Sequence, residues 1–465
     1  MKKFITHLIA EYISMSKYED FPPEVIHKAK QCILDSIGCM FGGILSKEGK
    51  ILIQSLLLNE TGHSTIIGYS KKTTFFNSIY INPISANILD FDDSVIGHPG
   101  ATVVPPAINL AELFELSGKE LIVSVIIAYE ISIRLGINLQ PLVSRESILG
   151  HGTWQTFGST SVACKLLNLS DESIANAFGI AGANAPVPSV MKTTYGLEGP
   201  TMAKNNFGSA SLAGIQSGFL AKNGFSGPKD IFDGDTGFWR MIGLEKNQVN
   251  ADIFNDLGKG FKILDIYFKL YPCCLFIHPT IDKVKQCIKK NHIELEKINK
   301  IFVKTVSPLS KMPFIKKKPE SAGDGRFSLP YTLACALFKV NVLKWYEESN
   351  LRNNLILNFA EKVEVQADSL ADQTFQQDQQ TILSRVYLVL DNDKKYFCND
   401  INDISHSNKS LSLDNNFKNK IFQLTQQVLK NSNRIDFLIN SIMELEDVSN
   451  IKKWLSNIRS DHNNI

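Results

Sequence analysis

Apolar residues change their spacing twice along this chain, and these changes limit its possible folds. Up to about residue 262 they recur at helical intervals, for example across 22–40. Beyond that point, short runs such as IFVKTV (301–306) and RVYLVL (385–390) are rich in β-branched residues, as strands are. From Phe417 the helical interval returns. We therefore expect a helical domain built from both chain ends and an α+β domain inserted between them.

The predicted fold class is mainly α with a smaller α+β domain. The helical domain would comprise residues 1–266 and 400–465, and the inserted domain, interpreted as a lid, residues 267–399. The stretch 401–415 is polar and rich in turn-forming residues, and 192–201 is expected to be a loop.

Proline, glycine and serine mark several expected helix ends. The prolines at 22–23 predict the start of a helix that the glycines at 42–43 would end. Helices at 107–116 and 120–134 should form a hairpin around the break at 117–118. Two further helices are predicted, one capped by Ser170 and one at 209–222.

The charge balance argues against a nucleic-acid or membrane-surface protein. The 465 residues include 49 Lys and Arg against 47 Asp and Glu, so no global field would attract a polyanion. The composition, 44% hydrophobic and 21% charged, is that of an ordinary globular protein. A small anionic substrate would have to be held by local groups.

Targeting, membrane and metal signals are missing from the sequence. The start, MKKFITHLIAEYI, is interpreted as an amphipathic helix, because His7 and Glu11 interrupt its apolar run. The most apolar stretch, 121–135, is shorter than the roughly 20 residues that span a bilayer, and it is interpreted as a buried helix. Eight scattered cysteines, with no CxxC or HExxH pattern, favour a reducing cytoplasm and predict no metal or cofactor.

Polar residues within apolar sequence mark the first candidate site, LDFDDSVIGHPG. Asp90, Asp92 and Asp93 precede Ser94 and His98 there, and three carboxylates could orient the histidine as an acid/base group. The alternative is a helix end with solvated aspartates.

Two further islands follow in the first half of the chain. His151 stands between glycines in GHGTWQTFGS, ahead of a helix whose N-terminus could hold an anion; an exposed loop histidine is the alternative. The loop KTTYGLEGPTMAKNNFGS carries Lys192, Tyr195 and Lys204 before the next helix. A lysine near a helix start is unremarkable by itself.

The last islands lie in the predicted inserted domain. FKLYPCCLFIHPTID contains Lys269 and His278, and Cys273 is a conceivable nucleophile, although a small apolar packing role is the more common one. GDGRFSLPYTLACAL places Arg326 and Tyr331 at the head of an apolar helix.

Taken in order, these segments, with FGIAGANA between them, resemble the MmgE/PrpD family. Its members include 2-methylcitrate dehydratases, cis-aconitate decarboxylases and an iminodisuccinate epimerase. The similarity runs from about residue 20 to residue 340. It implies a large helical domain, a smaller α+β lid, a homodimer and a small carboxylate substrate.

The resemblance also implies a set of site residues. The predicted catalytic residues are Asp90, His98, His151, Lys204, Lys269 and Tyr331. The predicted substrate-binding residues are Ser94, His151, Lys204, Lys269, His278 and Arg326. Ser94 replaces a threonine of the decarboxylases, and Asn206 and Phe207 stand where a histidine is often found.

These residue types suit proton-transfer chemistry without a metal. The two lysines would bind substrate carboxylates and developing negative charge, and His98, oriented by Asp90, would transfer the proton. His151 would bind a second carboxylate or act as the opposite acid/base group, and Tyr331 would donate a hydrogen bond or a proton. The favoured reaction is dehydration of a 2-methylcitrate-like hydroxy acid. Decarboxylation of a cis-aconitate-type acid, epimerisation of a dicarboxylate and metabolite binding without catalysis are the alternatives.

Overall fold

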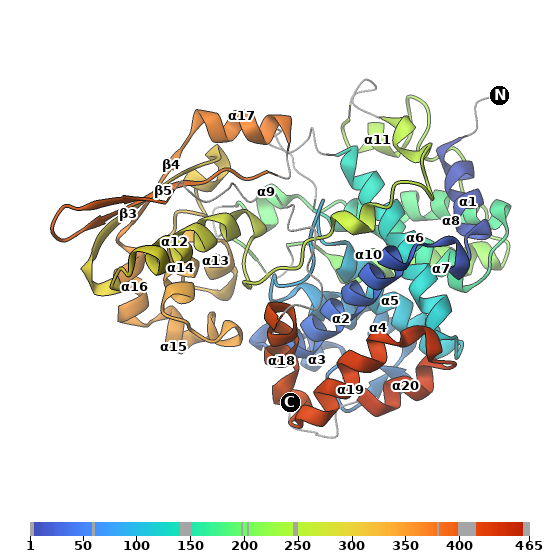
Figure 1. Ribbon diagram of the computed structural model, residues 1–465. Coiled ribbons are helices and arrows are strands. Elements are labelled where there is room, and N and C mark those ends of the chain that lie inside the picture. Colours follow the sequence, from blue (N-terminus) through green and yellow to red (C-terminus); the bar gives the residue numbers. More distant parts are fainter. Residues whose placement is uncertain are drawn as a thin grey trace. The chain divides into compact units, whose positions relative to one another are not determined.

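The computed structural model confirms the predicted fold class. The structure describes residues 4–57, 61–139, 150–196, 199–201, 204–244, 250–378, 381–398 and 415–458. These residues are mainly helical, with a two-stranded and a four-stranded sheet (Figure 1). The polar stretch predicted at 401–415 lies outside the described residues except for Asn415.

The chain folds into two compact units. The first comprises Met1–Val190, Ala203–Phe268 and Leu413–Ile465, and the second comprises Met191–Met202 and Lys269–Ser412. The segment 191–202, assigned from sequence to the helical domain, therefore belongs to the second unit. Tyr195 shows why, because its ring packs 6.2 Å from Phe314 and 6.5 Å from Phe327, centroid to centroid.

The first unit is helical. Helices α5, α6, α7 and α10 pack against one another, and α2 lies against α4, α5 and α6. A two-residue ladder joins β1 (Ser64–Thr65) to β2 (Lys72–Thr73). The helices of this unit are α1 (Ile5–Met15), α2 (Pro23–Leu45), α3 (Lys47–Leu56), α4 (Phe75–Asn87), α5 (Pro99–Leu113), α6 (Gly118–Ile137), α7 (Gly152–Leu166), α8 (Asp171–Asn184), α10 (Phe207–Lys222), α11 (Phe238–Met241), α18 (Asn415–Leu429), α19 (Ser432–Met443) and α20 (Ile451–Ile458).

The predicted end of the second helix at residues 42–43 was wrong. Helix α2 continues to Leu45, and Gly43 lies inside it. A Cβ atom at Gly43 would stand 1.9 Å from the carbonyl oxygen of Ser85 in α4. The glycine is thus required by a close helix crossing, and not by a helix end.

Helix α5 begins earlier than predicted and runs through two prolines. Pro106 lacks the N–H group that would bond to the carbonyl of Thr102. The hydroxyl of Ser159 in α7 donates to that carbonyl instead, at 2.5 Å. A neighbouring helix therefore satisfies the acceptor that proline leaves open, which makes the long helix possible.

Several other boundaries follow the sequence. Ser117 and Glu120 form a capping box at the start of α6, and Ser170 caps α8. No helix among the described residues, α6 included, is both long enough and apolar enough to cross a bilayer.

The second unit contains the predicted strands. Its sheet has the order β4-β3-β5-β6, with β3 parallel to β4 and antiparallel to β5. Helices α12 and α17 contact this sheet, and α14 packs on α12. The elements of the unit are α12 (His278–Asn291), β3 (Ile298–Thr305), α13 (Ala322–Phe327), α14 (Leu329–Leu337), α15 (Glu348–Leu351), α16 (Asn354–Ala360), β4 (Val363–Ala367), α17 (Ser369–Gln377), β5 (Arg385–Leu390) and β6 (Lys395–Phe397), with α9 (Val190–Thr193) at its boundary.

The C-terminal segment returns to the first unit and packs on its N-terminal part. Helices α18 and α19 contact α2, as the red and blue ribbons of Figure 1 show. Lys420 of α18 forms a buried ion pair with Asp35 of α2, at 2.5 Å, and donates to the carbonyl of Phe91 at 2.6 Å. The ammonium group of Lys420 thus connects α18, near the C-terminus, with α2, near the N-terminus, and with the loop between α4 and α5.

A second buried carboxylate supports the same loop. Asp93 accepts hydrogen bonds from the hydroxyl of Tyr129 in α6 and from the backbone N–H of Gly100. Burial raises the pKa of Asp93 to about 7, the charge of Asp35 adds to the increase, and the Tyr129 hydrogen bond opposes it.

We predict that Lys420→Met destabilises the protein strongly. The substitution leaves Asp35 buried without its counter-ion, which typically costs about 3–5 kcal/mol. The loss should appear as a lower urea midpoint, and Asp35→Asn combined with Lys420→Met should restore part of it. The exposed pair of Lys452 and Glu115 provides the control, because Lys452→Met should change little. An unchanged midpoint in Lys420→Met would contradict the role of the buried pair.

We predict that Asp93→Asn changes the pH dependence of stability. An unfolded aspartate loses its proton near its ordinary pKa of 3.8, whereas folded Asp93 loses it near 7. The stabilising contribution of the neutral form is therefore complete below about pH 4 and is lost as the pH rises to 7, at up to about 1.4 kcal/mol per pH unit. Relative to wild type, the unfolding free energy of Asp93→Asn should rise between pH 4 and pH 7. Parallel curves would refute this, and exposed Asp230→Asn serves as the control.

Candidate active site

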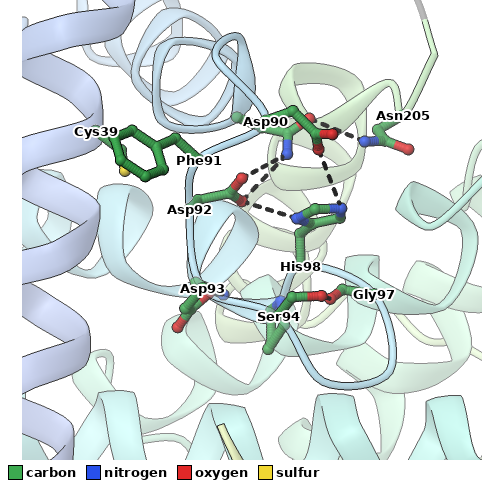
Figure 2. Close-up of polar contacts among 12 residues, drawn as sticks. Cys39, Asp90, Phe91, Asp92, Asp93, Ser94, Gly97, His98 and Asn205 are labelled. Atoms are coloured by element: carbon green, nitrogen blue, oxygen red, sulfur yellow. Dashed lines mark hydrogen bonds and ion pairs between the residues drawn. The ribbon is translucent and has the colours of Figure 1, made fainter. Parts of the chain in front are cut away.

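The first candidate site residue lies in the loop between α4 and α5. Asp90 has a positive φ of 53°, a left-handed conformation that aspartate adopts more readily than most residues. Its backbone N–H donates to the carbonyl of Asn87 at 2.8 Å, which closes a turn at the end of α4. This turn directs the Asp90 side chain towards His98 (Figure 2).

His98 lies between two carboxylates. It occupies the position before the first turn of α5, which begins at Pro99. Its Nε2 is 3.7 Å from Oδ1 of Asp90, and its Nδ1 is 3.2 Å from Oδ2 of Asp92. All three side chains are less than 10% exposed, so these charges interact with little screening by water.

The third carboxylate of the island does not face His98. Asp93 points away from the ring in Figure 2, towards Tyr129 and Gly100. A Cβ at Gly100 would lie 2.4 Å from Oδ1 of Asp93, so only glycine admits this contact. The expectation that three carboxylates surround the histidine was therefore wrong for Asp93, which is a structural residue.

Lys204 joins the cluster from a distant part of the chain. Its Nζ lies 3.0 Å from Oδ1 of Asp90, the oxygen that also faces His98. Asn206 follows with a φ of 55°, and this left-handed residue starts helix α10. Asp90 therefore connects a lysine ammonium to an imidazole.

His151 approaches the same group from the start of α7. Its ring centroid is 5.4 Å from that of His98 and 5.1 Å from that of Trp154. The N–H of Gly152 donates to the carbonyl of Asn205, and that of Thr153 donates to Gly150. These two N–H groups of the first turn of α7 therefore already have backbone acceptors.

The hydrogen bonds of Ser94 hold the backbone of its loop. Its backbone exchanges two hydrogen bonds with Tyr267, at 2.9 and 3.0 Å, and its hydroxyl donates to the carbonyl of Gly97 at 2.8 Å. The predicted contact of this hydroxyl with substrate stays a prediction.

The remaining predicted residues belong to the second unit. Lys269 is buried and follows Phe268, the last residue of the middle segment of the first unit. His278 is also buried, with its Nε2 3.4 Å from the carbonyl of Cys273 and its ring against Tyr271. Cys273 is fully buried within the apolar core of this unit, as expected of a packing group.

Tyr331 is part of that same core, and Arg326 is buried in the same unit. The Arg326 guanidinium lies over the ring of Tyr346, 5.2 Å from its centroid. The Tyr331 hydroxyl donates to the carbonyl of Trp345, and burial raises the pKa of Tyr331 above its ordinary value. A tyrosine so placed is a hydrogen-bond donor within its own unit, and its predicted role towards substrate stays a prediction.

Asp90, Asp92 and His98 also offer a possible cation site. One donor atom from each lies within 4.8 Å of the others. However, the ammonium of Lys204 already provides a positive charge 3.0 Å from Asp90. The cluster thus already contains a cation of the protein's own, and a metal ion would have to compete with it.

Sequence reasoning missed two neighbours of the cluster, Asn87 and Asn205. Asn87 donates to both oxygens of Asp92, at 2.9 and 3.1 Å, and Asn205 donates to Asn87 at 2.8 Å. The one sequence signal that could have pointed to Asn205 was its position directly after Lys204. Asn87 lies within the predicted helical region, where nothing distinguishes it from a surface amide.

Comparison with known proteins identifies the chain's relatives. Residues 7–249 match the MmgE/PrpD N-terminal domain, and residues 271–444 match the MmgE/PrpD C-terminal domain. Cis-aconitate decarboxylase of Aspergillus terreus strain NIH 2624 is 25% identical over 361 residues, which cover 72% of each chain. The human cis-aconitate decarboxylase is 26% identical over 353 residues, 72% of this chain and 71% of the relative.

A third relative is the cis-aconitate decarboxylase-like protein oryM of Aspergillus oryzae. It is 24% identical over 373 residues, 73% of this chain and 74% of the relative. Residues 250–270 separate the two matched domains. This interval contains the boundary between Phe268 of the first unit and Lys269 of the second unit. With domain matches over most of its length, this chain belongs to the MmgE/PrpD family of enzymes.

Proposed function

We propose that this protein is a carboxy-lyase that decarboxylates cis-aconitate or a closely related unsaturated tricarboxylate. The observation that carries the proposal is the Lys204–Asp90–His98 cluster, which places an ammonium and an imidazole on one buried carboxylate. The relatives are named as cis-aconitate decarboxylases, which favours this reaction over the dehydration preferred from sequence alone.

The reaction requires one bond cleavage and one proton transfer. The bond to the leaving carboxylate breaks, and its electron pair forms a new carbon–carbon double bond. The original double bond shifts its electrons to the far carbon, which takes a proton as carbon dioxide leaves. Negative charge develops at that carbon and spreads into its carboxylate group, so the enzyme needs cations there and an acid nearby.

His98 is the proposed acid. Its Nε2 faces Asp90, the carboxylate that also pairs with Lys204, while Asp92 lies at the opposite ring nitrogen. An imidazole held between two carboxylates is placed to take up a proton and deliver it to substrate. Because the side chains of His98, Asp90 and Asp92 are buried, bulk water does not compete for this proton.

Lys204 and His151 are the proposed substrate-binding groups of the first unit. An ammonium attracts a carboxylate strongly where water is scarce, and the His151 ring lies 5.4 Å from that of His98. Lys269 is proposed for a further carboxylate. His278, Arg326 and Tyr331 are proposed as supporting groups, and no metal ion or cofactor is required.

Dehydration of a 2-methylcitrate-like acid is the second candidate. The sequence departs from the decarboxylase pattern at Ser94, Asn206 and Phe207, and the Ser94 hydroxyl donates to Gly97. Removal of a proton and loss of water could use the same imidazole and ammonium groups.

We predict that the full-length protein converts cis-aconitate with loss of carbon dioxide. It should be incubated with cis-aconitate, 2-methylcitrate, citrate and iminodisuccinate, with and without EDTA. Mass spectrometry distinguishes lost carbon dioxide from lost water, ultraviolet absorbance follows double bonds, and chiral chromatography detects epimerisation. Water loss from 2-methylcitrate without decarboxylation would establish the second candidate instead. Activity abolished by EDTA and restored by a metal would refute metal independence.

We predict that His98→Gln and Lys204→Met each lower turnover by about 10²–10⁴-fold, because each removes a group that transfers or stabilises charge. Matched controls are His63→Gln and Lys222→Met, both at exposed positions, which should retain activity. Unfolding midpoints near that of wild type would show that the variants fold. Wild-type turnover in either site variant would overturn its assignment.

A further inference from the structure

A continuous series of polar contacts leads from Asn205 through Asn87 and Asp92 to the Nδ1 side of the His98 ring. The side-chain amide of Asn205 donates to Oδ1 of Asn87 at 2.8 Å. The amide of Asn87 then donates to both oxygens of Asp92, at 2.9 and 3.1 Å. Oδ2 of Asp92 lies 3.2 Å from Nδ1 of His98. Figure 2 shows Asp92 directed at the ring of His98.

The contacts leave Asn87 little choice of orientation. Its oxygen accepts from Asn205, so its nitrogen must face Asp92, and rotating the amide by half a turn would place two nitrogen donors together. Asp92 is held through both oxygens and is 1% exposed. The carboxylate is therefore fixed beside Nδ1 of His98 by the amide of Asn87, which Asn205 orients in turn.

Asn205 also connects the three islands of the first unit. Its backbone carbonyl accepts the N–H of Gly152, the residue after His151, at 3.2 Å. It follows Lys204 directly, and its side chain leads through Asn87 to Asp92. A shift of Asn205 would consequently disturb His98, His151 and Lys204 together.

We propose that Asp92, held by Asn87 and Asn205, is the positioning residue of His98. A buried carboxylate beside Nδ1 favours the tautomer with its hydrogen on Nδ1. Nε2, which faces the Asp90 carboxylate, is then the atom that exchanges a proton with substrate. This assignment rests on the proposed function only in taking His98 as the proton-transfer residue.

Nδ1 and Oδ2 of Asp92 are 3.2 Å apart but are not aligned as a hydrogen bond in this structure. Hydrogen bonds at active sites are often poorly aligned before substrate binds and tighten in the complex. Asp90 does not replace Asp92, because it is farther from the ring, at 3.7 Å, and is paired with Lys204. The two carboxylates therefore have separate tasks.

Asp92→Asn tests the proposal with almost no change of shape. An asparagine here presents its oxygen to the amide of Asn87, so its own NH₂ faces Nδ1 of His98 and selects the tautomer with hydrogen on Nε2. We expect kcat to fall by about 10²–10⁴-fold with little change in KM, as in triads that lose their aspartate. Asn87→Leu, which frees Asp92, should give a smaller loss, on the order of 10-fold.

Nitrogen-15 NMR of the histidine rings reads the tautomer directly, and it needs no turnover. The spectra should be recorded at a pH high enough for neutral rings, and the His98 signals assigned by their absence in His98→Gln. Wild type should carry hydrogen on Nδ1, and Asp92→Asn should carry it on Nε2. Asp93→Asn is the matched control, because Asp93 faces Tyr129, and it should keep the wild-type tautomer.

The outcomes separate this inference from the proposed function. Hydrogen on Nε2 in wild type, or an unchanged tautomer in Asp92→Asn, would overturn the positioning role, and the wild-type spectrum gives this answer even if the variant fails to fold. A tautomer that switches as expected supports the role, whatever substrate the panel identifies. If cis-aconitate is not decarboxylated, the proposed reaction fails while the positioning role stands.

Discussion

The ammonium of Lys420 lies in the interior of the helical unit, between the carboxylate of Asp35 and the carbonyl of Phe91. Its side chain is 2% exposed and that of Asp35 is not exposed at all. Burial of an ion pair gives little net stability, but loss of one partner leaves a charge that the apolar interior cannot solvate. The loop that carries Asp90, Asp92 and His98 is thus held in place by a residue from the C-terminal segment.

Two sets of charged residues surround that loop. In the first set, Lys420 balances Asp35, while Asp93 has its pKa raised to about 7 by burial. In the second set, Asp90 faces the ammonium of Lys204 and Asp92 faces the ring of His98. The first set fixes the backbone and the second contains the proposed catalytic groups, so neighbouring aspartates have different surroundings.

Much of the fold could be predicted from sequence, because the relevant signals are local. The capping serine at 170 gave a correct helix start, the break expected at 117–118 lies where α6 begins, and the β-branched runs gave strands of the second unit. The failures arose where packing overrides local preference. Gly43 lies inside a helix because α4 crosses there, and residues 191–202 join the second unit through the aromatic contacts of Tyr195.

The sequence by itself determined the candidate site residues, their order along the chain and the family to which the chain belongs. Asp90, His98, His151 and Lys204 were all recognisable because each stands in a short, distinctive segment. Only the tertiary structure decided that Asp92 faces Nδ1 of His98, that Asp93 turns away, and that Asn87 and Asn205 hold Asp92. Asn205 and Asn87 are 118 residues apart, and Lys420 and Phe91 are 329 apart. Such contacts depend on how helices pack, which no local sequence pattern records.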